Sequence, residues 1–382
     1  MSRKHFSLLL VVTLAVAAAV LLLPGRTGHE SGMARATFLP DLQAEVNGLD
    51  WLRIRGPGDR VVATLERSGD HWQVDEANGY RADWERLRAL LADLAQAEVV
   101  EAKTDNPAYY SRLGVEDVEA PDAGGLQIEF AESTGLPAVI VGKRAEGRDG
   151  RYVRRADSAA SALIDRNLEL PAATTDWLET DIVDIPDSEV VEVDILHADG
   201  ERVVTRKVSA DDEHFLLQDV PDGREIRSEW TVDSLANALS SLTLEAVRPQ
   251  GELDWGDASQ FAVVTADGLR VEASLIEVAT TPAADPGEGG DEGGAAASAP
   301  GEYWIRLQAG LYQTALDSAV QEPDTAADDA SAEAASGPDA AERARVINGR
   351  VDGWAYRIPK YKFDAMNKRM EDLLKAPAEA DS

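Results

Sequence analysis

The chain contains the stretch RVVATLERSGDHWQV at residues 60–74, which carries its clearest secondary-structure signal. Apolar and polar residues alternate on both sides of Ser68-Gly69-Asp70, a sequence typical of a tight turn, so two antiparallel strands are expected. An earlier apolar run contains Trp51 and Ile54 and is separated from this stretch by Gly56-Pro57-Gly58-Asp59. Together the three runs predict a β-meander.

After the meander, the period of the pattern changes from strand to helix. Asp83 can act as an N-cap, and four large apolar residues follow on one stripe of an amphipathic helix. The stripe consists of Trp84, Leu87, Leu91 and Leu94. Alternation then returns and predicts strands at Leu126–Phe130, Val139–Val141 and Tyr152-Val153. Residues 46–168 therefore predict one unit made of a β-meander, a helix and a β-hairpin.

The same order of elements recurs further along the chain. The matched segments are Arg60-Val61-Val62 with Arg202-Val203-Val204, Asp70-His71-Trp72 with Glu213-His214-Phe215, and Leu126–Phe130 with Phe261–Thr265. A second helix is expected from Thr231 as N-cap, with the stripe Val232, Leu235, Leu239 and Leu242. We therefore predict an α+β fold with two tandem copies of the unit, 46–168 and 189–310, joined by a connector, 169–188. The alternative is chance similarity within an ordinary α+β chain.

Two acidic, low-complexity tracts interrupt the second half of the chain. Residues 280–301 are rich in glycine, alanine and acidic residues, and they lie between a strand that ends near Val278 and a strand at Tyr303-Trp304-Ile305. If the chain is duplicated, this tract is a disordered loop inserted into a hairpin and not a domain boundary, since loop closure entropy grows slowly with length. Residues 311–345 form the second tract.

The last segment, 346–382, is expected to add closing strands and a helix. The strands are indicated by Val346, Val351, Trp354, Tyr356 and Ile358. The helix is expected at Lys360–Lys375, where apolar residues recur on one side.

The N-terminus indicates a cellular location. The uncharged run Phe6–Leu23 is 18 residues long and follows Arg3 and Lys4. At about 1.5 Å per residue, such a helix nearly spans the roughly 30 Å hydrocarbon core of a bilayer. Residues 1–25 are therefore predicted to be a single-pass inner-membrane anchor with a cytoplasmic N-terminus, followed by a spacer, 26–45, and a periplasmic or extracytoplasmic body. The alternative is a cleaved signal peptide, whose apolar region is usually shorter, about 7–15 residues.

Composition excludes several classes of function. The chain has 37 Lys and Arg residues against 70 Asp and Glu residues, a net charge of −33. Such an acidic chain repels phosphate backbones, so nucleic-acid binding is disfavoured. The chain has no cysteine, which excludes a disulfide scaffold, a thiolate nucleophile and a lipid-modified N-terminal cysteine.

No catalytic, cofactor or metal site is predicted from motifs. The glycines at 287–294 match neither the Rossmann nor the Walker spacing, the histidines lack metal-ligand spacing, and no serine-nucleophile motif occurs. His71 and His214 occupy equivalent positions beside Trp72 and Phe215. Since these aromatic residues should face the core, both imidazoles should face solvent. Most of the tryptophans are expected to pack in the core.

Several short motifs, together with the N-terminal run, resemble those of a known family. They are His71-Trp72-Gln73-Val74, Tyr80-Arg81-Ala82-Asp83, Tyr110-Ser111-Arg112-Leu113-Gly114-Val115, Val139-Ile140-Val141-Gly142 and Arg151-Tyr152-Val153-Arg154. Over most of 46–310 the chain resembles an uncharacterised bacterial family, domain of unknown function 4340. Members of that family often lie beside genes for an ABC-type export system related to the gliding-motility transporter. The resemblance therefore implies an accessory subunit that faces the extracytoplasmic space, and it implies no catalytic residues.

These features predict a membrane-anchored accessory or binding protein of the cell envelope with no catalysis of its own. Its expected partners are the bilayer, through residues 6–23, and subunits of an ABC transporter. Two alternatives come from other classes. One is an envelope hydrolase or glycan-binding enzyme with a site between the two repeats, and the other is a structural spacer.

Overall fold

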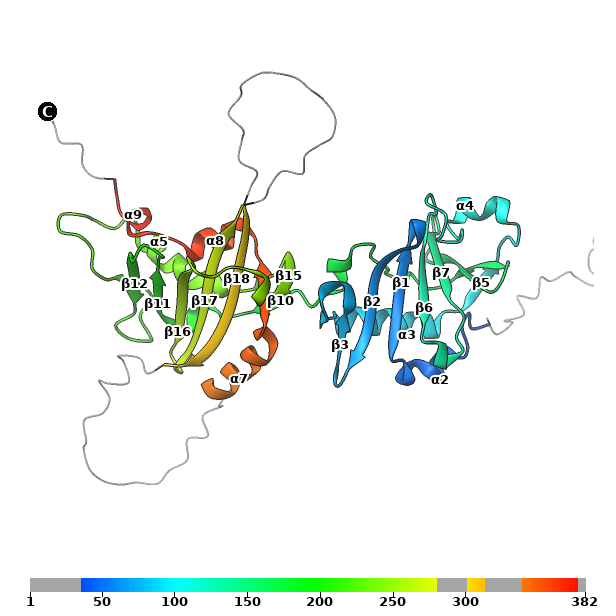
Figure 1. The fold of residues 1–382 in the computed structure, drawn as a ribbon, viewed down its shortest axis with the longest axis horizontal. Coiled ribbons are helices and arrows are strands. Elements are labelled where there is room, and N and C mark those ends of the chain that lie inside the picture. Colours follow the sequence, from blue (N-terminus) through cyan, green and yellow to red (C-terminus); the bar gives the residue numbers. More distant parts are fainter. Residues whose placement is uncertain (1–35, 280–300, 313–338, 377–382) are drawn as a thin grey trace, which may run out of the picture. The chain divides into compact units, whose positions relative to one another are not determined.

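The computed structural model describes residues 36–279, 301–312 and 339–376 (Figure 1). By their contacts, these residues form two compact units. Unit 1 contains the described residues up to Leu49, Arg55–Arg60 and Arg88–Leu170, and unit 2 contains Asp50–Ile54, Val61–Leu87 and the described residues from Pro171 onward. The predicted α+β class is confirmed, because antiparallel sheets are combined with short helices.

The first half of the chain builds a nine-stranded sheet. In chain order, with η for a 3-10 helix, its elements are α2 (Leu42–Glu45), η1 (Val46–Gly48), β1 (Trp51–Gly56), η2 (Pro57–Asp59), β2 (Arg60–Ser68), β3 (His71–Val74), η3 (Asp75–Ala77), β4 (Tyr80–Arg81), α3 (Trp84–Gln96), β5 (Val99–Ala102), η4 (Pro107–Tyr109), α4 (Tyr110–Leu113), β6 (Leu126–Phe130), η5 (Glu132–Thr134), β7 (Val139–Arg144), β8 (Arg151–Arg155) and β9 (Ser161–Ile164). The strand order is β4-β3-β2-β1-β6-β7-β8-β9-β5. The predicted meander is confirmed by β1 to β3, and the three later predicted strands by β6 to β8.

The second half builds an eight-stranded sheet and a separate two-stranded one. Its elements are η6 (Thr174–Trp177), β10 (Asp181–Val183), η7 (Asp187–Glu189), β11 (Val190–Leu196), β12 (Arg202–Arg206), β13 (Leu216–Leu217), α5 (Glu229–Asp233), η8 (Ser234–Leu239), β14 (Leu242–Thr243), β15 (Ala246–Pro249), η9 (Gln250–Glu252), β16 (Ser259–Thr265), β17 (Leu269–Val278), β18 (Glu302–Leu311), α7 (Ala340–Val351), β19 (Trp354–Arg357), α8 (Lys360–Met366) and α9 (Met370–Leu373). The strand order of the larger sheet is β13-β12-β11-β16-β17-β18-β19-β15, and β10 pairs with β14. Figure 1 shows β16, β17 and β18 side by side, with α7 near one end.

The long hairpin of the second sheet agrees with its prediction. Strands β17 and β18 pair from Leu269 with Leu311 to Val278 with Glu302. The tract 280–301 therefore connects two paired strands, as expected for a loop inserted into a hairpin. The residues of that tract up to 300 lie outside the described part of the chain.

The first predicted helix is largely correct. The Oδ1 atom of Asp83 accepts a 2.9 Å hydrogen bond from the backbone N–H of Arg86, so Asp83 caps α3 as predicted. The three leucines of the stripe, Leu87, Leu91 and Leu94, are buried. Trp84 is 48% exposed, so its placement on the buried stripe was wrong. It is the first residue of the helix, where the chain is only entering the packed face.

The second predicted helix is wrong in its start and its length. Ser228, not Thr231, is the N-cap, because its hydroxyl accepts a hydrogen bond from the Thr231 N–H. The α-helix ends at Asp233 and continues as the 3-10 helix η8, and Leu242 lies in β14. The four stripe residues are nevertheless all buried, at Val232, Leu235, Leu239 and Leu242. The apolar residues stay buried because η8 continues the turn of the helix, although as a tighter 3-10 helix.

Two predictions for the last segment are also wrong. Val346 and Val351 lie in the helix α7 and not in closing strands, although Trp354 and Tyr356 do lie in a strand, β19. The expected helix Lys360–Lys375 is divided into α8 and α9. The division occurs because Asn367 leaves the helical conformation, and the Asp372 carboxylate then accepts a hydrogen bond from the Arg369 N–H and caps α9.

The predicted spacer and connector both contain packed structure. Of the spacer 26–45, the described part contains buried Leu39 and Leu42, and the Phe38 N–H donates to the Ala97 carbonyl. The connector 169–188 contains β10 and the fully buried Trp177. Both segments are therefore bound to the units and are not free linkers, because they bury apolar side chains.

The predicted membrane anchor cannot be located in the fold. Phe6–Leu23 lies outside the described residues. Among the helices of residues 36–279, 301–312 and 339–376, none combines the length and apolar character needed to cross a membrane.

Candidate functional site

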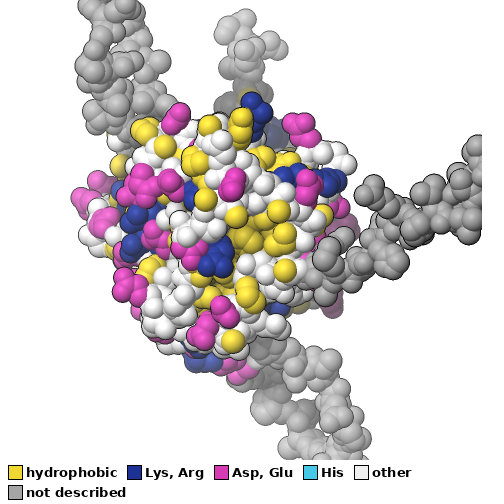
Figure 2. All heavy atoms as spheres, turned by 90° about the vertical axis from the view of Figure 1, so that its right-hand side faces the viewer, with side chains coloured by type: hydrophobic (Ala, Val, Ile, Leu, Met, Phe, Trp, Pro, Cys, Tyr) yellow, Lys and Arg dark blue, Asp and Glu magenta, His cyan; other side chains and the backbone are white. Residues whose placement is uncertain are grey.

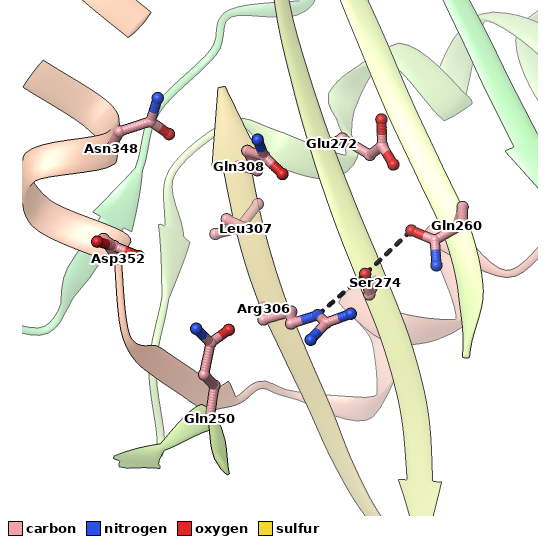
Figure 3. Close-up of a pocket in the computed structure, with 9 residues that line it drawn as sticks. All are labelled: Gln250, Gln260, Glu272, Ser274, Arg306, Leu307, Gln308, Asn348 and Asp352. Carbon is pink, nitrogen blue, oxygen red and sulfur yellow. Dashed lines mark hydrogen bonds between the residues drawn. The ribbon is translucent and has the colours of Figure 1, made fainter. Parts of the chain in front are cut away.

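The second sheet carries a polar cleft of about 650 Å³, shown in Figure 3. The cleft lies over β16, β17 and β18 and is bordered by α7 and by the start of η9. Its lining residues are Gln250, Gln260, Glu272, Ser274, Arg306, Leu307, Gln308, Asn348 and Asp352. We call this set the polar cleft.

Strand register brings the floor of the polar cleft together. Gln260 of β16 lies opposite Ser274 of β17, and Ser274 lies opposite Arg306 of β18. Glu272 and Gln308 form the neighbouring pair. Successive side chains of a strand point to opposite faces, so these residues share one face while residues between them, such as Ala273, are buried.

Hydrogen bonds hold the central row in place. The Ser274 hydroxyl donates to Oε1 of Gln260 at 3.0 Å, and Nε of Arg306 donates to the Ser274 hydroxyl at 3.3 Å (Figure 3). The Arg306 guanidinium also stacks over the Trp255 ring, 4.8 Å from its centroid. Trp255 is positioned in turn by its indole N–H, which donates to the Gln250 carbonyl at 2.9 Å. The guanidinium is therefore held on two sides.

On one side of the polar cleft, α7 covers part of the edge of β18. The pairing of β18 with β19 is limited to Trp304 with Arg357 and Ile305 with Tyr356. Beyond that point, the Asn348 amide takes the place of a neighbouring strand. Its Oδ1 accepts from the Ala309 N–H and its Nδ2 donates to the Ala309 carbonyl, both at 2.8 Å. Asn348 is thus a structural part of the wall.

The charges in the polar cleft are mixed. Arg306 is its cation, and Glu272 and Asp352 are its two carboxylates. Glu272 also lies 3.4 Å from the guanidinium of Arg270 on the same strand. Near the start of β18, the indole N–H of Trp304 donates to Glu302 and lowers the pKa of that carboxyl, and Arg357 adds to the effect.

A second, more apolar groove of about 340 Å³ lies between β10 and α7. It is lined in part by Ile182, Ile185, Val346 and Ile347. Val346 is 56% exposed, which reflects its position on the outer side of α7. Charged residues also line it, but Arg343 pairs with Glu189 and Asp267, Arg350 pairs with Glu179, and Glu342 pairs with Arg345. Fewer polar groups are therefore left to orient a ligand there, and the polar cleft is the better candidate site.

His71 and His214 face solvent, as predicted, while Trp72 and Phe215 beside them are buried. Nδ1 of His214 lies 2.8 Å from the Asp233 carboxylate, and Nε2 lies 3.6 Å from Glu229. The hydrogen bond with Asp233, aided by the charges of Asp233 and Glu229, raises the pKa of His214. Within the described ranges, no three His, Asp or Glu side chains gather in a metal-binding geometry.

Three of the five motifs that carry the family resemblance contribute to a buried cluster in unit 1. Tyr110, Val115 and Ile140 form its core, with Leu113 and Tyr152 packed against it. Gly142 approaches this segment so closely that a Cβ atom on it would lie 2.3 Å from the Leu113 carbonyl oxygen. These three motifs therefore serve packing in this region and do not line an open site.

Arg154 is buried under the same cluster and is 4% exposed. Its Nε donates to the Val115 carbonyl at 2.8 Å, its Nη1 donates to the Ser158 carbonyl at 3.2 Å, and its Nη2 pairs with Asp117. The guanidinium also lies over the Tyr110 ring. All of these partners come from the chain itself, so Arg154 is fully satisfied by the fold.

The comparison with known families agrees with these motifs. The family described as "Domain of unknown function (DUF4340)" matches residues 72–260. Over this stretch, the chain belongs to that family. The match to domain of unknown function 4340 contains the Tyr110 cluster and Gln260, but it ends before Glu272 and Arg306. No curated protein and no solved structure matches the chain.

The surface carries both signs of charge. Figure 2 shows one face on which acidic and basic side chains are interleaved with hydrophobic ones. Local ion pairs are common; for example, hydrogen bonds from Arg155 lower the pKa of Asp157. Most of the tryptophans were expected in the core, but Trp84 and Trp230 are 48% and 78% exposed. The absence of nucleic-acid partners stays a prediction from net charge.

Motif searching missed the residues of the polar cleft. The signal that could have found them is alternation, because polar residues stand two positions apart on two of the strands, at Glu272 and Ser274 and at Arg306 and Gln308. Polar residues at every second position of a strand normally indicate a solvated face. Only the register and the wall from α7 turn that face into a cleft.

Proposed function

We propose that the protein is an extracytoplasmic, membrane-anchored accessory or binding protein of the cell envelope, and that it acts as an auxiliary subunit of an ABC-type export system. The location is supported by the uncharged run Phe6–Leu23 behind Arg3 and Lys4. The partner is supported by membership of the 4340 family and by the gene neighbourhood that the family resemblance implies. In this arrangement the N-terminus of the chain lies in the cytoplasm, and the body that follows the anchor lies in the periplasm or extracytoplasmic space.

The polar cleft is the observation that carries the binding part of this role. Its groups are placed to hold a ligand more than to transform one. The Ser274 hydroxyl donates to an amide and accepts from Arg306, so neither neighbour is a base that could activate it as a nucleophile. Three lining residues, Gln250, Gln260 and Gln308, carry side-chain amides. An amide does not take up a proton in neutral water, so it cannot act as a base.

The two sheets also support an origin by duplication. Apart from the extra edge strand β4 of the first sheet, each sheet starts with three strands in reverse chain order, β3-β2-β1 or β13-β12-β11, and continues with four strands in chain order, β6 to β9 or β16 to β19. The last place is taken by β5, which follows α3, in the first sheet and by β15, which follows α5, η8 and the short strand β14, in the second. We infer from this common order that the chain contains two tandem copies of one unit.

Affinity purification tests the proposed partnership. The full chain, tagged at its C-terminus and solubilised in mild detergent, should recover the subunits of one transporter reproducibly. A matched strain would carry the body behind a cleavable signal in place of residues 1–25. Release of the body should abolish recovery of the transporter and the associated phenotype, because a tethered subunit gains its effective concentration from the membrane. Full function of the released body would contradict the anchored role.

A further inference from the structure

The polar cleft has the size and lining of a small-molecule site. We propose that it binds a neutral, hydroxyl-rich ligand, a saccharide, and this assignment rests on the proposed role as a binding protein. Its volume of about 650 Å³ lies within the range of ligand pockets, roughly 300–1,000 Å³. Leu307 is the one apolar residue among those that line it, so an apolar ligand would gain little from burial there.

The first sheet shows what a guanidinium in this position needs. Gln127, Ile140 and Arg154 form the same kind of row as Gln260, Ser274 and Arg306, since they lie opposite one another on three neighbouring strands. Gln127, Ile140 and Arg154 are the row of the first sheet, and Gln260, Ser274 and Arg306 are the row of the second. Arg154 donates to carbonyl and carboxylate oxygens through all three of its nitrogens.

Arg306 lacks most of these acceptors. Its Nε donates to Ser274, but its two terminal nitrogens have no hydrogen-bond partner in the part of the chain that the structure describes. Those nitrogens lie over the floor of the polar cleft in Figure 3. A ligand that fills the cleft would therefore supply oxygen acceptors to Arg306, as the segment around Val115 does for Arg154.

The rest of the lining adds both donors and acceptors. Oε1 of Gln260 already accepts from Ser274, which leaves its NH2 group as a donor. Glu272 and Asp352 can only accept, and the amides of Gln250 and Gln308 can do both. A hydroxyl group both donates and accepts, so a ring that carries several hydroxyls can satisfy groups of either kind from one rigid frame.

Two other ligand classes fit less well. An anion would meet two carboxylates, Glu272 and Asp352, against the single guanidinium of Arg306. An extended peptide would bind by pairing with a free strand edge, but the Asn348 amide already occupies the N–H and carbonyl of Ala309 on the edge of β18. The neutral saccharide is the class that meets neither obstacle.

Calorimetry on the full chain tests the ligand class. The protein should be solubilised in a polyoxyethylene detergent, because detergents with sugar headgroups would compete. The probes are cellobiose, maltotriose and chitotriose as neutral saccharides, digalacturonate as an acidic one, and trialanine as a peptide. We expect at least one neutral saccharide to bind with a single-site isotherm, and to bind at least about tenfold tighter than digalacturonate or trialanine. Tighter binding of the acid or the peptide, or no binding of any neutral probe, would overturn the proposal.

Substitutions then locate the site. Gln308→Ala and Arg306→Gln should each weaken binding of the neutral saccharide about tenfold, since each removes hydrogen bonds to the ligand. Gln218→Ala is the matched control, because Gln218 lies outside the polar cleft and its side chain donates only to the Leu216 carbonyl. Thermal unfolding checks that the variants are folded. Unchanged affinity in both cleft variants would refute this location.

The outcome can be separated from that of the proposed function. If no saccharide binds but the transporter is recovered, only the ligand class fails. If a saccharide binds and no transporter is recovered, the partnership fails and the cleft stands. Appearance of new reducing ends after incubation with the bound saccharide would keep the ligand class but replace the non-catalytic role with a hydrolase.

Discussion

Two rows of three residues, one in each large sheet, have the same strand geometry but different surroundings. In the first sheet, Gln127, Ile140 and Arg154 are all buried, with Ile140 inside the cluster around Tyr110 and Arg154 against the Tyr110 ring. In the second sheet, the row formed by Gln260, Ser274 and Arg306 forms the floor of an open cleft. The same strand geometry therefore produces a packed core in one place and a candidate site in the other.

The middle residue of each row explains the difference. Ile140 offers an apolar surface on which Tyr110 and Val115 can pack. Ser274 offers a hydroxyl, and covering it with apolar groups would cost free energy unless its hydrogen bonds were kept. The chain itself can therefore pack over Ile140, whereas water or a polar ligand is better suited to cover Ser274. If this contrast holds, substitutions in the packed region should cost more stability than matched substitutions in the polar cleft.

The largest effect is expected where the cluster meets the first sheet. Gly142→Ala would place a methyl group 2.3 Å from the Leu113 carbonyl oxygen and 2.8 Å from that of Gly114. Neither backbone can move without disturbing the Tyr110 cluster, so the free energy of unfolding should fall by about 3 kcal/mol. Urea denaturation followed by circular dichroism measures the loss. Gly310→Ala in β18 is the control, since nothing lies within 4 Å of the added atom; an equal loss there would remove the contrast.

The two arginines should differ in their effect on stability. Arg154→Ala leaves the carbonyls of Val115 and Ser158 without their donor in a buried site, so we expect a loss of about 2–3 kcal/mol. Arg306→Ala should cost about 1 kcal/mol or less, because it removes one hydrogen bond and one stacking contact between half-buried side chains. The same denaturation measurement compares them. Equal losses would mean that Arg306 is as much a structural residue as Arg154.

The wall of the polar cleft should depend on both hydrogen bonds of Asn348. Asn348→Ala removes the partners of the Ala309 N–H and carbonyl, and we expect a loss of about 1–2 kcal/mol. Asn348→Asp keeps the acceptor for the N–H but turns the donor into a second oxygen that faces the carbonyl. Hydrogen exchange at Ala309 should therefore be fast in the alanine variant and slower in the aspartate variant. Equal protection in all three proteins would show that another group closes this edge.

The smallest effect concerns His214 and its dependence on pH. Its hydrogen bond with Asp233 raises its pKa above the usual value of 6.5. Protonated His214 therefore stabilises the folded state at pH values below about 6.5, and this contribution is lost as pH rises through the raised pKa. An NMR titration should show the midpoint above 6.5, and Asp233→Asn should lower it. A midpoint that does not move would exclude Asp233 as the cause.

Local features were predictable from local sequence. The alternation around Trp72 correctly placed the strands of the first meander, and Asp83 correctly marked the start of α3. The same method failed at Val346 and Val351, where a helix was read as strands. Two apolar residues five positions apart are compatible with either structure, so their pattern alone could not decide.

The candidate site was not predictable in this way. Gln260, Ser274 and Arg306 come from three strands, and the last is separated from the others by the tract 280–301. Asn348 reaches the site from a helix that follows a further long segment. No spacing rule connects residues at such distances, because strand pairing and not sequence separation brings them together.

The sequence by itself determined which segments alternate, where turns and caps fall, and that the chain is acidic and free of cysteine, because these properties depend on neighbours in the chain. Only the tertiary structure decided that Arg154 is buried and Arg306 lies in a cleft. Both arginines follow an aromatic and a β-branched residue in a strand, so their local signals are alike. What differs is the segment that packs over each one, and long-range packing determines that.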